Sequence, residues 1–397
     1  MKKLSNRGFL VLAYLAYACV YVGRLNLTIA TPALEDAAIL DAAQIGAMGG
    51  AFFLCYALGQ LANGFLGDLL PPRRMVTAGL FFAAVGNLGI ALLPPAGMIF
   101  VLWGANGVAQ SMLWGPLLRM LALRYPGEAK TRVASWFSTS VGVGSILGIF
   151  LASAAVALWD VRAAFWLPGV LTAAACGVVA WRFPDLPAAS RAPKGRQLLR
   201  DLRAQCAVLR QRTLWVLMAV AALHGVIKDN LNLWVAAYFA DTYALDLAAL
   251  SFYVFFIPLL TLAGRMVFPF LLRRAHDDEH RVSLLAFLVV AACLLLLAGS
   301  CGGMGAALAA LSLIAAAISM INASLLSIYP TRFDHCGCVS TVVGLMDFMT
   351  YLGAGVSSVV YGRLLAHIGY AGMFRSWLVI ALLALALTAL ARQLGEK

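Results

Sequence analysis

The chain has 397 residues, of which 63% are hydrophobic and only 12% are charged, and this composition excludes an ordinary soluble domain. The formal net charge of +12 would suit a nucleic-acid-binding protein, but most of the positive charge falls in short segments between long apolar runs. The sequence therefore predicts an all-α membrane protein that has no nucleic-acid partner.

Twelve apolar runs are long enough to cross the hydrocarbon core of a bilayer as helices, which takes about 20 residues each. They cover residues 9–31, 44–67, 75–93, 98–122, 133–158, 163–181, 214–239, 248–272, 282–299, 303–328, 337–361 and 373–391. The first run is too long for the apolar region of a cleaved signal peptide, so we expect it to be retained. A basic linker at 183–212 divides the chain into an N-terminal bundle, 1–182, and a C-terminal bundle, 213–397.

The connecting segments are strongly asymmetric in charge. If both termini lie in the cytoplasm, 22 of the 29 Lys and Arg residues fall in cytoplasmic segments, and only Arg162, Arg363 and Arg375 fall outside. This distribution follows the positive-inside rule for twelve helices. We therefore predict a multi-pass monomer in the lipid bilayer of the inner (plasma) membrane, with both termini cytoplasmic.

The two halves of the chain repeat one another. Arg24, Asn26 and Leu27 recur 204 residues later as Lys228, Asn230 and Leu231. Two further sets recur in the same order, namely Gly64, Arg73 and Arg74 as Gly264, Arg273 and Arg274, and Phe137, Thr139, Gly142 and Gly144 as Phe348, Thr350, Gly353 and Gly355. Six-helix halves related in this way around a midplane site are a transporter architecture, so we predict two pseudo-symmetric six-helix bundles.

Two of the repeated positions place a cation deep inside an apolar run. A charge at the centre of a bilayer costs about 2.5–3.5 kcal/mol on insertion scales. The repeat makes Arg24 and Lys228 equivalent, so we expect them to face each other across the interface between the halves. Two cations about 10 Å apart repel by roughly 1.7 kcal/mol at an effective dielectric constant of about 20, and an anion between them turns this repulsion into attraction. The pattern predicts a shared anion site, and the alternative is that an acidic neighbour neutralises each cation.

Acidic and basic residues near Lys228 leave several roles open. Asp347 lies midway along its run and either pairs with Lys228 until substrate binds, which we favour, or couples a proton, or contacts the amino group of a zwitterion. His224 lies one turn before Lys228 and either lines the site or is an ordinary core histidine. Asp229 is expected to point about 100° away from Lys228.

Further polar and aromatic residues are candidates for the same site. Arg119 and Arg265 lie near the ends of their runs, where their heads can snorkel to the interface, and Arg119 either extends the anion path or serves a gate. Asn26 and Asn230 repeat, and buried amides need hydrogen-bond partners. The aromatic candidates, for which core packing is an equal alternative, are Tyr17, Tyr21, Trp114, Trp136, Trp234 and Tyr351.

The segment 64–74 joins the second run to the third. Gly64 allows close helix approach, Asp68 can accept hydrogen bonds from arginines or from a helix N-terminus, and Arg73 and Arg74 follow the turn. This spacing resembles the signature loop of the major facilitator superfamily, which implies a gating latch, and the alternative is a simple charged turn. The second half has Phe268 in place of the aspartate, so any latch is asymmetric.

Longer segments resemble the organophosphate:phosphate antiporters, the group with the glycerol-3-phosphate and hexose-phosphate transporters. The resemblance rests on Tyr21-Val-Gly-Arg24-Leu-Asn26, on Trp114-Gly-Pro116-Leu-Leu-Arg119, on Ile227-Lys228 through Trp234 to Tyr238, and on Ile328-Tyr-Pro330 to Tyr351-Leu-Gly353. It implies anion exchange by alternating access, with Arg24 and Lys228 as the anion-binding positions. The chain departs from the family at Leu25 and Gln60, which stand for lysines, and at Ser140, which stands for a histidine. This less positive pocket makes a carboxylate, a less charged phosphate or a zwitterion plausible beside a phosphate ester.

The sequence thus predicts a secondary transporter that moves a small organic anion or zwitterion as an antiporter. Two alternatives stay open, a membrane receptor that senses an extracellular anion and a proton-coupled exporter that uses Asp347. We expect neither an enzyme nor a cofactor, because no nucleophile or phosphate loop is visible. No metal is expected either, since Cys336-Gly-Cys338 is a lone pair of cysteines without further ligands.

Overall fold

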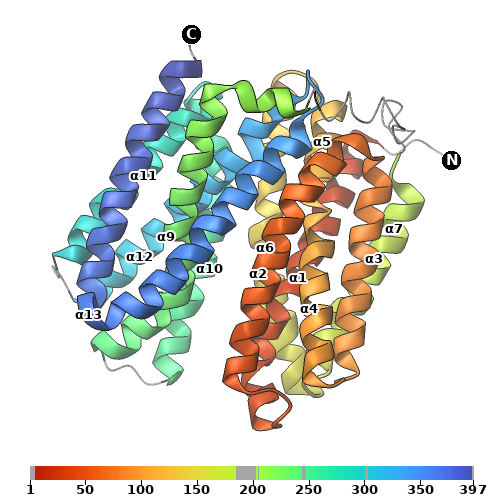
Figure 1. Cartoon of the computed structure of the whole chain (residues 1–397), viewed down its shortest axis with the longest axis vertical. Helices are drawn as coiled ribbons and strands as arrows, with labels where there is room; N and C mark the ends of the chain where they lie inside the picture. Colours follow the sequence, from red (N-terminus) through yellow and green to blue (C-terminus); the bar gives the residue numbers. More distant parts are fainter. Residues whose placement is uncertain (1–4, 185–202, 204, 244–246, 300–302, 396–397) are drawn as a thin grey trace. The chain divides into compact units, whose positions relative to one another are not determined.

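The computed structural model describes residues 5–184, 203, 205–243, 247–299 and 303–395. These residues are almost entirely helical and contain no strand, which confirms the predicted all-α class. They form two compact units, one of Met1–Cys206 with Pro330–Leu345 and one of Ala207–Tyr329 with Met346–Lys397 (Figure 1). The predicted linker at 183–212 lies mostly outside the described residues.

Among the described residues up to Arg182, unit 1 contains seven helices that make six membrane crossings. They are α1 (Asn6–Asp36), α2 (Ala42–Leu69), α3 (Pro72–Ala91), α4 (Ala96–Ser111), α5 (Trp114–Arg124), α6 (Glu128–Leu158) and α7 (Ala163–Arg182). Helices α4 and α5 together form one crossing with a break between them. Pro116 lies in the first turn of α5, where its missing N–H removes no helical hydrogen bond. The proline of the Trp-Gly-Pro segment therefore helps to start a helix.

Unit 2 contains the remaining long helices. They are α9 (Arg212–Tyr243), α10 (Leu247–Arg274), α11 (Glu279–Ala298), α12 (Met304–Ala323) and α13 (Val339–Gly395), whose residues up to Leu345 belong to unit 1. At 57 residues α13 would be about 85 Å long if straight, more than twice the thickness of the hydrocarbon core. It turns back at Gly369, whose φ of 61° is left-handed. The reversal of the blue ribbon is visible in Figure 1. The helix therefore holds both of the last two predicted crossings.

The helices that the structure describes account for twelve crossings. Ten segments are long and apolar enough to span a membrane when α13 is counted once. Counting α13 twice and adding α10, which has 28 residues, gives the predicted number. Their exposed faces carry large apolar side chains such as Leu54, Val101, Phe150 and Val379, each more than 60% exposed. Side chains of this kind suit contact with lipid tails.

Close helix approaches occur at glycines that the repeat singled out. A Cβ atom on Gly144 would lie 2.6 Å from the carbonyl oxygen of Ala18, and one on Gly353 would overlap the carbonyl oxygen of Ala222. Ala18 and Ala222 are 204 residues apart, which is also the spacing of the repeated cations. In each unit the cation-bearing helix therefore packs against a matching glycine. Gly144 and Gly353 are 209 residues apart, whereas the sequence repeat pairs glycines that are 211 residues apart. The glycines with equivalent contacts therefore differ by two positions from those that the sequence repeat pairs.

We expect Gly353→Ala to destabilise unit 2, because the new methyl group overlaps a backbone oxygen that cannot retreat without separating two helices. Overpacking of this kind costs about 1–3 kcal/mol. Gly355→Ala is the matched control, because nothing lies within 4 Å of a Cβ atom at that position. The control should be neutral or gain up to about 1 kcal/mol from the higher helix propensity of alanine. Thermal unfolding of the purified variants measures the difference, and equal melting temperatures would contradict this packing.

Candidate functional site

Arg24 of α1 has its guanidinium group enclosed by aromatic rings. The guanidinium carbon lies 4.3 Å from the ring centroid of Tyr56, 5.1 Å from Phe52, 5.4 Å from Tyr21 and 5.9 Å from Phe53. The residue is 8% exposed. A cation over an aromatic face gains about 0.5–2 kcal/mol, which offsets part of the cost of its depth. The rings carry no net charge, so they do not themselves neutralise the guanidinium.

The rings on α2 follow a four-residue spacing that the sequence analysis missed. Phe52, Tyr56 and Gln60 lie on one face of this helix, since residues four apart are neighbours. The side-chain nitrogen of Gln60 donates to the hydroxyl oxygen of Tyr56 at 2.6 Å. Gln60, which family resemblance alone suggested, is therefore linked to Arg24 through a tyrosine. The spacing of Phe52 and Tyr56 ahead of Gln60 was the available signal.

Buried amides hold the backbone of α1 next to Arg24. The side-chain nitrogens of Asn87, Asn106 and Gln110 donate to the carbonyl oxygen of Gly23 at 3.2, 3.1 and 3.2 Å. Asn26, which is fully buried, donates to Asn87 at 2.7 Å and to a backbone carbonyl of α7 at 2.9 Å. These bonds fix the rotation of α1 and thereby the direction of Arg24. The side-chain nitrogen of Asn26 is engaged in hydrogen bonds between helices, and contact of Asn26 with a ligand stays a prediction.

Other candidates of unit 1 lie in an aromatic cluster. The ring of Trp114 lies 4.7 Å from that of Phe137 in a stacked arrangement and 4.6 Å from that of Tyr17. Ser140 is fully buried and donates to the carbonyl oxygen of Phe137 at 2.6 Å. Core packing therefore accounts for the positions of Trp114 and Ser140, whereas Trp136 is half-buried. Substrate contact by any of the three stays a prediction.

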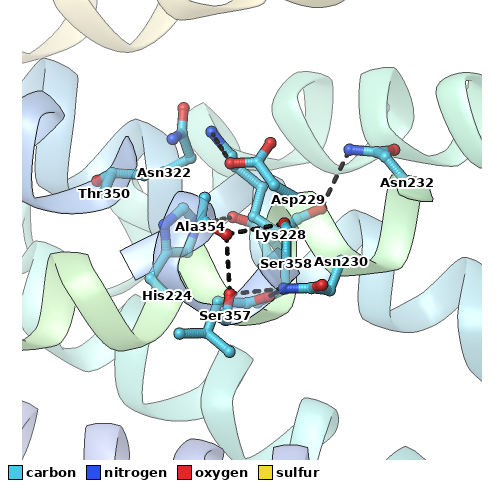
Figure 2. A network of polar contacts seen from close by, with 12 residues as sticks. His224, Lys228, Asp229, Asn230, Asn232, Asn322, Thr350, Ala354, Ser357 and Ser358 are labelled. Atoms are coloured by element: carbon cyan, nitrogen blue, oxygen red, sulfur yellow. Dashed lines mark hydrogen bonds and ion pairs between the residues drawn. The ribbon is translucent and has the colours of Figure 1, made fainter. Parts of the chain in front are cut away.

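Lys228 of α9 has a carboxylate and an aromatic ring beside it. Its ammonium nitrogen lies 3.3 Å from a carboxylate oxygen of Asp229 and 4.6 Å from the ring centroid of Tyr351. Figure 2 shows the ion pair of Lys228 and Asp229 as a dashed line. The prediction that Asp229 points away is wrong, because the flexible stem of lysine lets its head reach an adjacent side chain. The two side chains are 20% and 26% exposed. The pair with Asp347, which is 4% exposed, stays a prediction.

Asn230 is buried between α9 and α13. Its side-chain nitrogen donates to the hydroxyl oxygen of Ser357 at 2.7 Å and to the carbonyl oxygen of Val226 at 2.8 Å (Figure 2). Its side-chain oxygen accepts from the indole nitrogen of Trp234 at 3.2 Å. The repeated asparagines are thus both hydrogen-bonded within their own unit. For Asn230, as for Asn26, ligand contact stays a prediction.

His224 and Arg265 are buried in unit 2. The Nε2 atom of His224 lies 3.1 Å from the carbonyl oxygen of Ile318, and the residue is fully buried. This contact favours the alternative of a hydrogen-bonded core histidine. Arg265 is 6% exposed and donates to the side-chain oxygen of Asn322 at 2.8 Å. Its head lies inside the protein, so the expectation that it snorkels is wrong.

The signature loop holds the first turn of α13 through Asp68. The carboxylate accepts from the backbone N–H groups of Ser340 at 3.0 Å and Thr341 at 2.7 Å. The Nε atom of Arg119 lies 3.7 Å from the same carboxylate, and this arginine donates to the carbonyl oxygen of Gly67 at 2.8 Å. Both kinds of partner predicted for Asp68, an arginine and a helix N-terminus, are therefore present. The partial positive charge of the helix end adds to the attraction.

The remaining residues of the loop occupy distinct positions. A Cβ atom on Gly64 would lie 2.8 Å from the Cα atom of Gly344, which confirms the close approach expected there. Arg119 is 7% exposed and does not snorkel; its contacts favour the gate role, and a place in the anion path stays a prediction. Arg73 donates to a backbone carbonyl of α7, whereas Arg74 is exposed.

We expect Asp68→Asn to lower the melting temperature of the protein. The change removes a buried charge that serves two backbone donors and an arginine, and a hydrogen bond to a charged group contributes about 1.5–3 kcal/mol. Asp41→Asn is the control, because Asp41 caps α2 at an exposed position and asparagine caps a helix equally well. The two variants lose the same charge. Equal shifts in thermal unfolding would argue against a special role for Asp68.

Comparison with known proteins assigns the chain to a family. Residues 13–346 match the model described as Major Facilitator Superfamily. A probable hexose phosphate transport protein of Chlamydia trachomatis is 27% identical over 174 residues, which cover 44% of this chain and 38% of that protein. The membrane sensor protein UhpC of Salmonella typhimurium is 26% identical over 262 residues, or 61% of this chain and 58% of the sensor. The alignments thus span less than two-thirds of these relatives.

Solved structures share the fold at lower identity. FucP, a transporter crystallised in the outward conformation, is 16% identical with a TM-score of 0.77, and the match covers 96% of this chain and 98% of FucP. The human organic anion transporter MFSD10 (TETRAN) is 17% identical with a TM-score of 0.76, and the match covers 96% of this chain and 99% of the transporter. At these identities the likeness shows the arrangement of helices.

Proposed function

Because the chain belongs to the Major Facilitator Superfamily, we propose that it is a secondary transporter that moves a small organic anion across the inner membrane by alternating access. The observation that carries this proposal is Arg24, an 8% exposed cation on a membrane-spanning helix with four aromatic rings around it. Burying this charge at membrane depth destabilises the folded protein, but it provides a positive charge that can hold an anion. The family is one of transporters, and the chain is not an enzyme.

Arg24 and Lys228 differ in how they can bind an anion. The guanidinium of Arg24 is planar and carries a fork of N–H donors, which is suited to a bidentate bond with phosphate or carboxylate. Lys228 is a compact charge that Asp229 balances at 3.3 Å. We propose that Arg24 is the principal anion-binding residue and that Lys228 is a second one, released from Asp229 as substrate binds. We also propose that the protein exchanges one anion for another.

A phosphate ester is the substrate class with the most support. The relatives include a probable hexose phosphate transport protein, and a glycerol-3-phosphate transporter of Haemophilus influenzae is 26% identical over 148 residues. Arginine recognises phosphate and carboxylate through the same fork geometry, so carboxylates and zwitterions are the competing classes. We expect both termini to lie in the cytoplasm, as the distribution of Lys and Arg indicates.

Counterflow in proteoliposomes tests the proposal. Vesicles that contain the purified protein and internal inorganic phosphate should take up labelled glycerol 3-phosphate or glucose 6-phosphate. Vesicles without internal anion should take up much less. Uptake of labelled succinate and alanine tests the two competing substrate classes, carboxylates and zwitterions. Equal uptake with and without internal anion would exclude antiport, and uptake of succinate alone would exclude the phosphate ester.

A second candidate function is anion sensing, because the alignment with the sensor UhpC covers more of this chain than that with the chlamydial protein. A sensor should bind a phosphate ester, as thermal stabilisation would report, yet carry no counterflow. Proton-coupled export through Asp347 is the third candidate. It requires flux that follows an imposed pH gradient and stops in Asp347→Asn.

A further inference from the structure

Helices α3 and α7 of unit 1 enclose a surface pocket of about 520 Å³. Arg73 and Arg74 in the first turn of α3 line one end of it, and Phe81 and Phe82 line the other. Cys176 belongs to the opposite wall, which α7 forms. The pocket is therefore basic at the helix end and apolar along the helix.

The lining of the basic end is positively charged. It contains two arginines and no carboxylate. Arg74 is exposed, and Arg73 donates a hydrogen bond to a carbonyl of α7. Arg182 lies in the last turn of α7, two residues beyond the lining residue Ala180, and its guanidinium carbon lies 4.2 Å from the ring centroid of Trp181. This tryptophan is 61% exposed, and exposed tryptophans are typical of the boundary between lipid and water.

The apolar end continues into the part of α3 that crosses the membrane. Phe81 and Phe82 are 53% and 56% exposed. At 1.5 Å per residue, Phe81 lies about 10 Å along the helix from Arg74. A ligand that fills the whole pocket is thus an amphiphile with an anionic head and an apolar chain. A free anion would leave the apolar end empty.

We propose that this pocket binds an anionic phospholipid of the leaflet that faces the basic loops. Its phosphate group lies against Arg73 and Arg74, and an acyl chain lies along Phe81 and Phe82. Basic pockets between membrane helices select anionic head groups in this way. The inference rests on the membrane-spanning fold and is independent of the substrate proposed above.

The opposite end of the same helix pair provides an internal contrast. A second pocket of about 590 Å³ lies there, with Leu88, Leu92 and Trp166 in its lining. Its charged residues are Arg162 and Asp160, which carry opposite charges. A pocket without net charge has no reason to prefer an anionic head group over a zwitterionic one. Arg162 therefore offers a matched control for the arginines of the first pocket.

Native mass spectrometry of the full-length protein with equal amounts of phosphatidylglycerol and phosphatidylcholine tests the inference. The wild type should retain phosphatidylglycerol in preference to phosphatidylcholine. Arg74→Gln should weaken that retention roughly fivefold, the effect of one basic residue near an anionic head group, and Arg74→Glu should abolish it. Arg162→Gln should retain the lipid as the wild type does. Arg74 is exposed, so these variants leave the bond from Arg73 to α7 in place.

Three results would overturn the inference. The first is equal retention of the two lipids by the wild type. The second is equal loss of phosphatidylglycerol in Arg74→Gln and Arg162→Gln, or no loss in Arg74→Glu. The third is thermal stabilisation by millimolar inorganic phosphate that matches that by phosphatidylglycerol and disappears in Arg74→Glu, because the pocket would then be a site for a soluble anion.

Discussion

Arg24→Gln is expected to reduce counterflow of a phosphate ester about 30-fold or more, because truncating one partner of a buried charge-assisted contact costs about 2–5 kcal/mol. The protein should remain folded, since the glutamine places no charge among the rings of Phe52, Tyr56 and Tyr21. Initial rates in proteoliposomes and melting temperatures measured on the same preparations separate the two effects. Uptake at the wild-type rate in Arg24→Gln would refute the site.

Two further variants distinguish the shape of Arg24 from its charge. Arg24→Lys keeps the charge and loses both the fork geometry and the stacking, so it should raise KM while retaining part of the rate. Tyr56→Phe keeps the ring under the guanidinium and loses only the hydroxyl that accepts from Gln60. We expect Tyr56→Phe to transport nearly as well as the wild type. A loss as large as that in Arg24→Gln would mean that the hydroxyl binds substrate.

Lys228→Gln should also abolish counterflow, whereas Asp229→Asn should have the opposite effect on affinity. In the wild type the ammonium group of Lys228 lies 3.3 Å from Asp229, so a bound anion competes with that carboxylate. The pair is partly exposed, and such pairs contribute about 1 kcal/mol at most, which predicts a KM up to about fivefold lower in Asp229→Asn. Substrate concentration series in proteoliposomes measure this change.

The double variant and a remote control complete this test. Lys228→Gln with Asp229→Asn should be as inactive as Lys228→Gln alone, because the carboxylate acts through the lysine. Asp241→Asn makes the same charge change on α9 at an exposed position, where Asp241 accepts from Tyr370, and should leave KM unchanged. If Asp229→Asn raises KM or lowers it no more than Asp241→Asn, the competition does not occur.

Properties that depend on the hydropathy, chemistry and spacing of residues close together in the chain could be predicted from the sequence. Hydropathy over about 20 residues determines whether a segment crosses a membrane, so the crossings were predicted to within several residues. The helix N-terminus and arginine that bind Asp68, and the tight contact at Gly64, also followed from residue chemistry and spacing. The turn at Gly369 lies in the predicted gap between the last two runs.

Properties that depend on which helices meet, and on the rotamer of each side chain, were decided by the tertiary structure. The rings of Phe52 and Tyr56 come to Arg24 from another helix, and no feature of α1 predicts that contact. Lys228 reaches Asp229 through torsions of its flexible stem, which helical spacing does not describe. The sequence by itself thus determined that this protein crosses the membrane and carries a deep cation in each half. The packing of separate helices decided what surrounds each cation, because burial and hydrogen bonding arise between segments far apart in the chain.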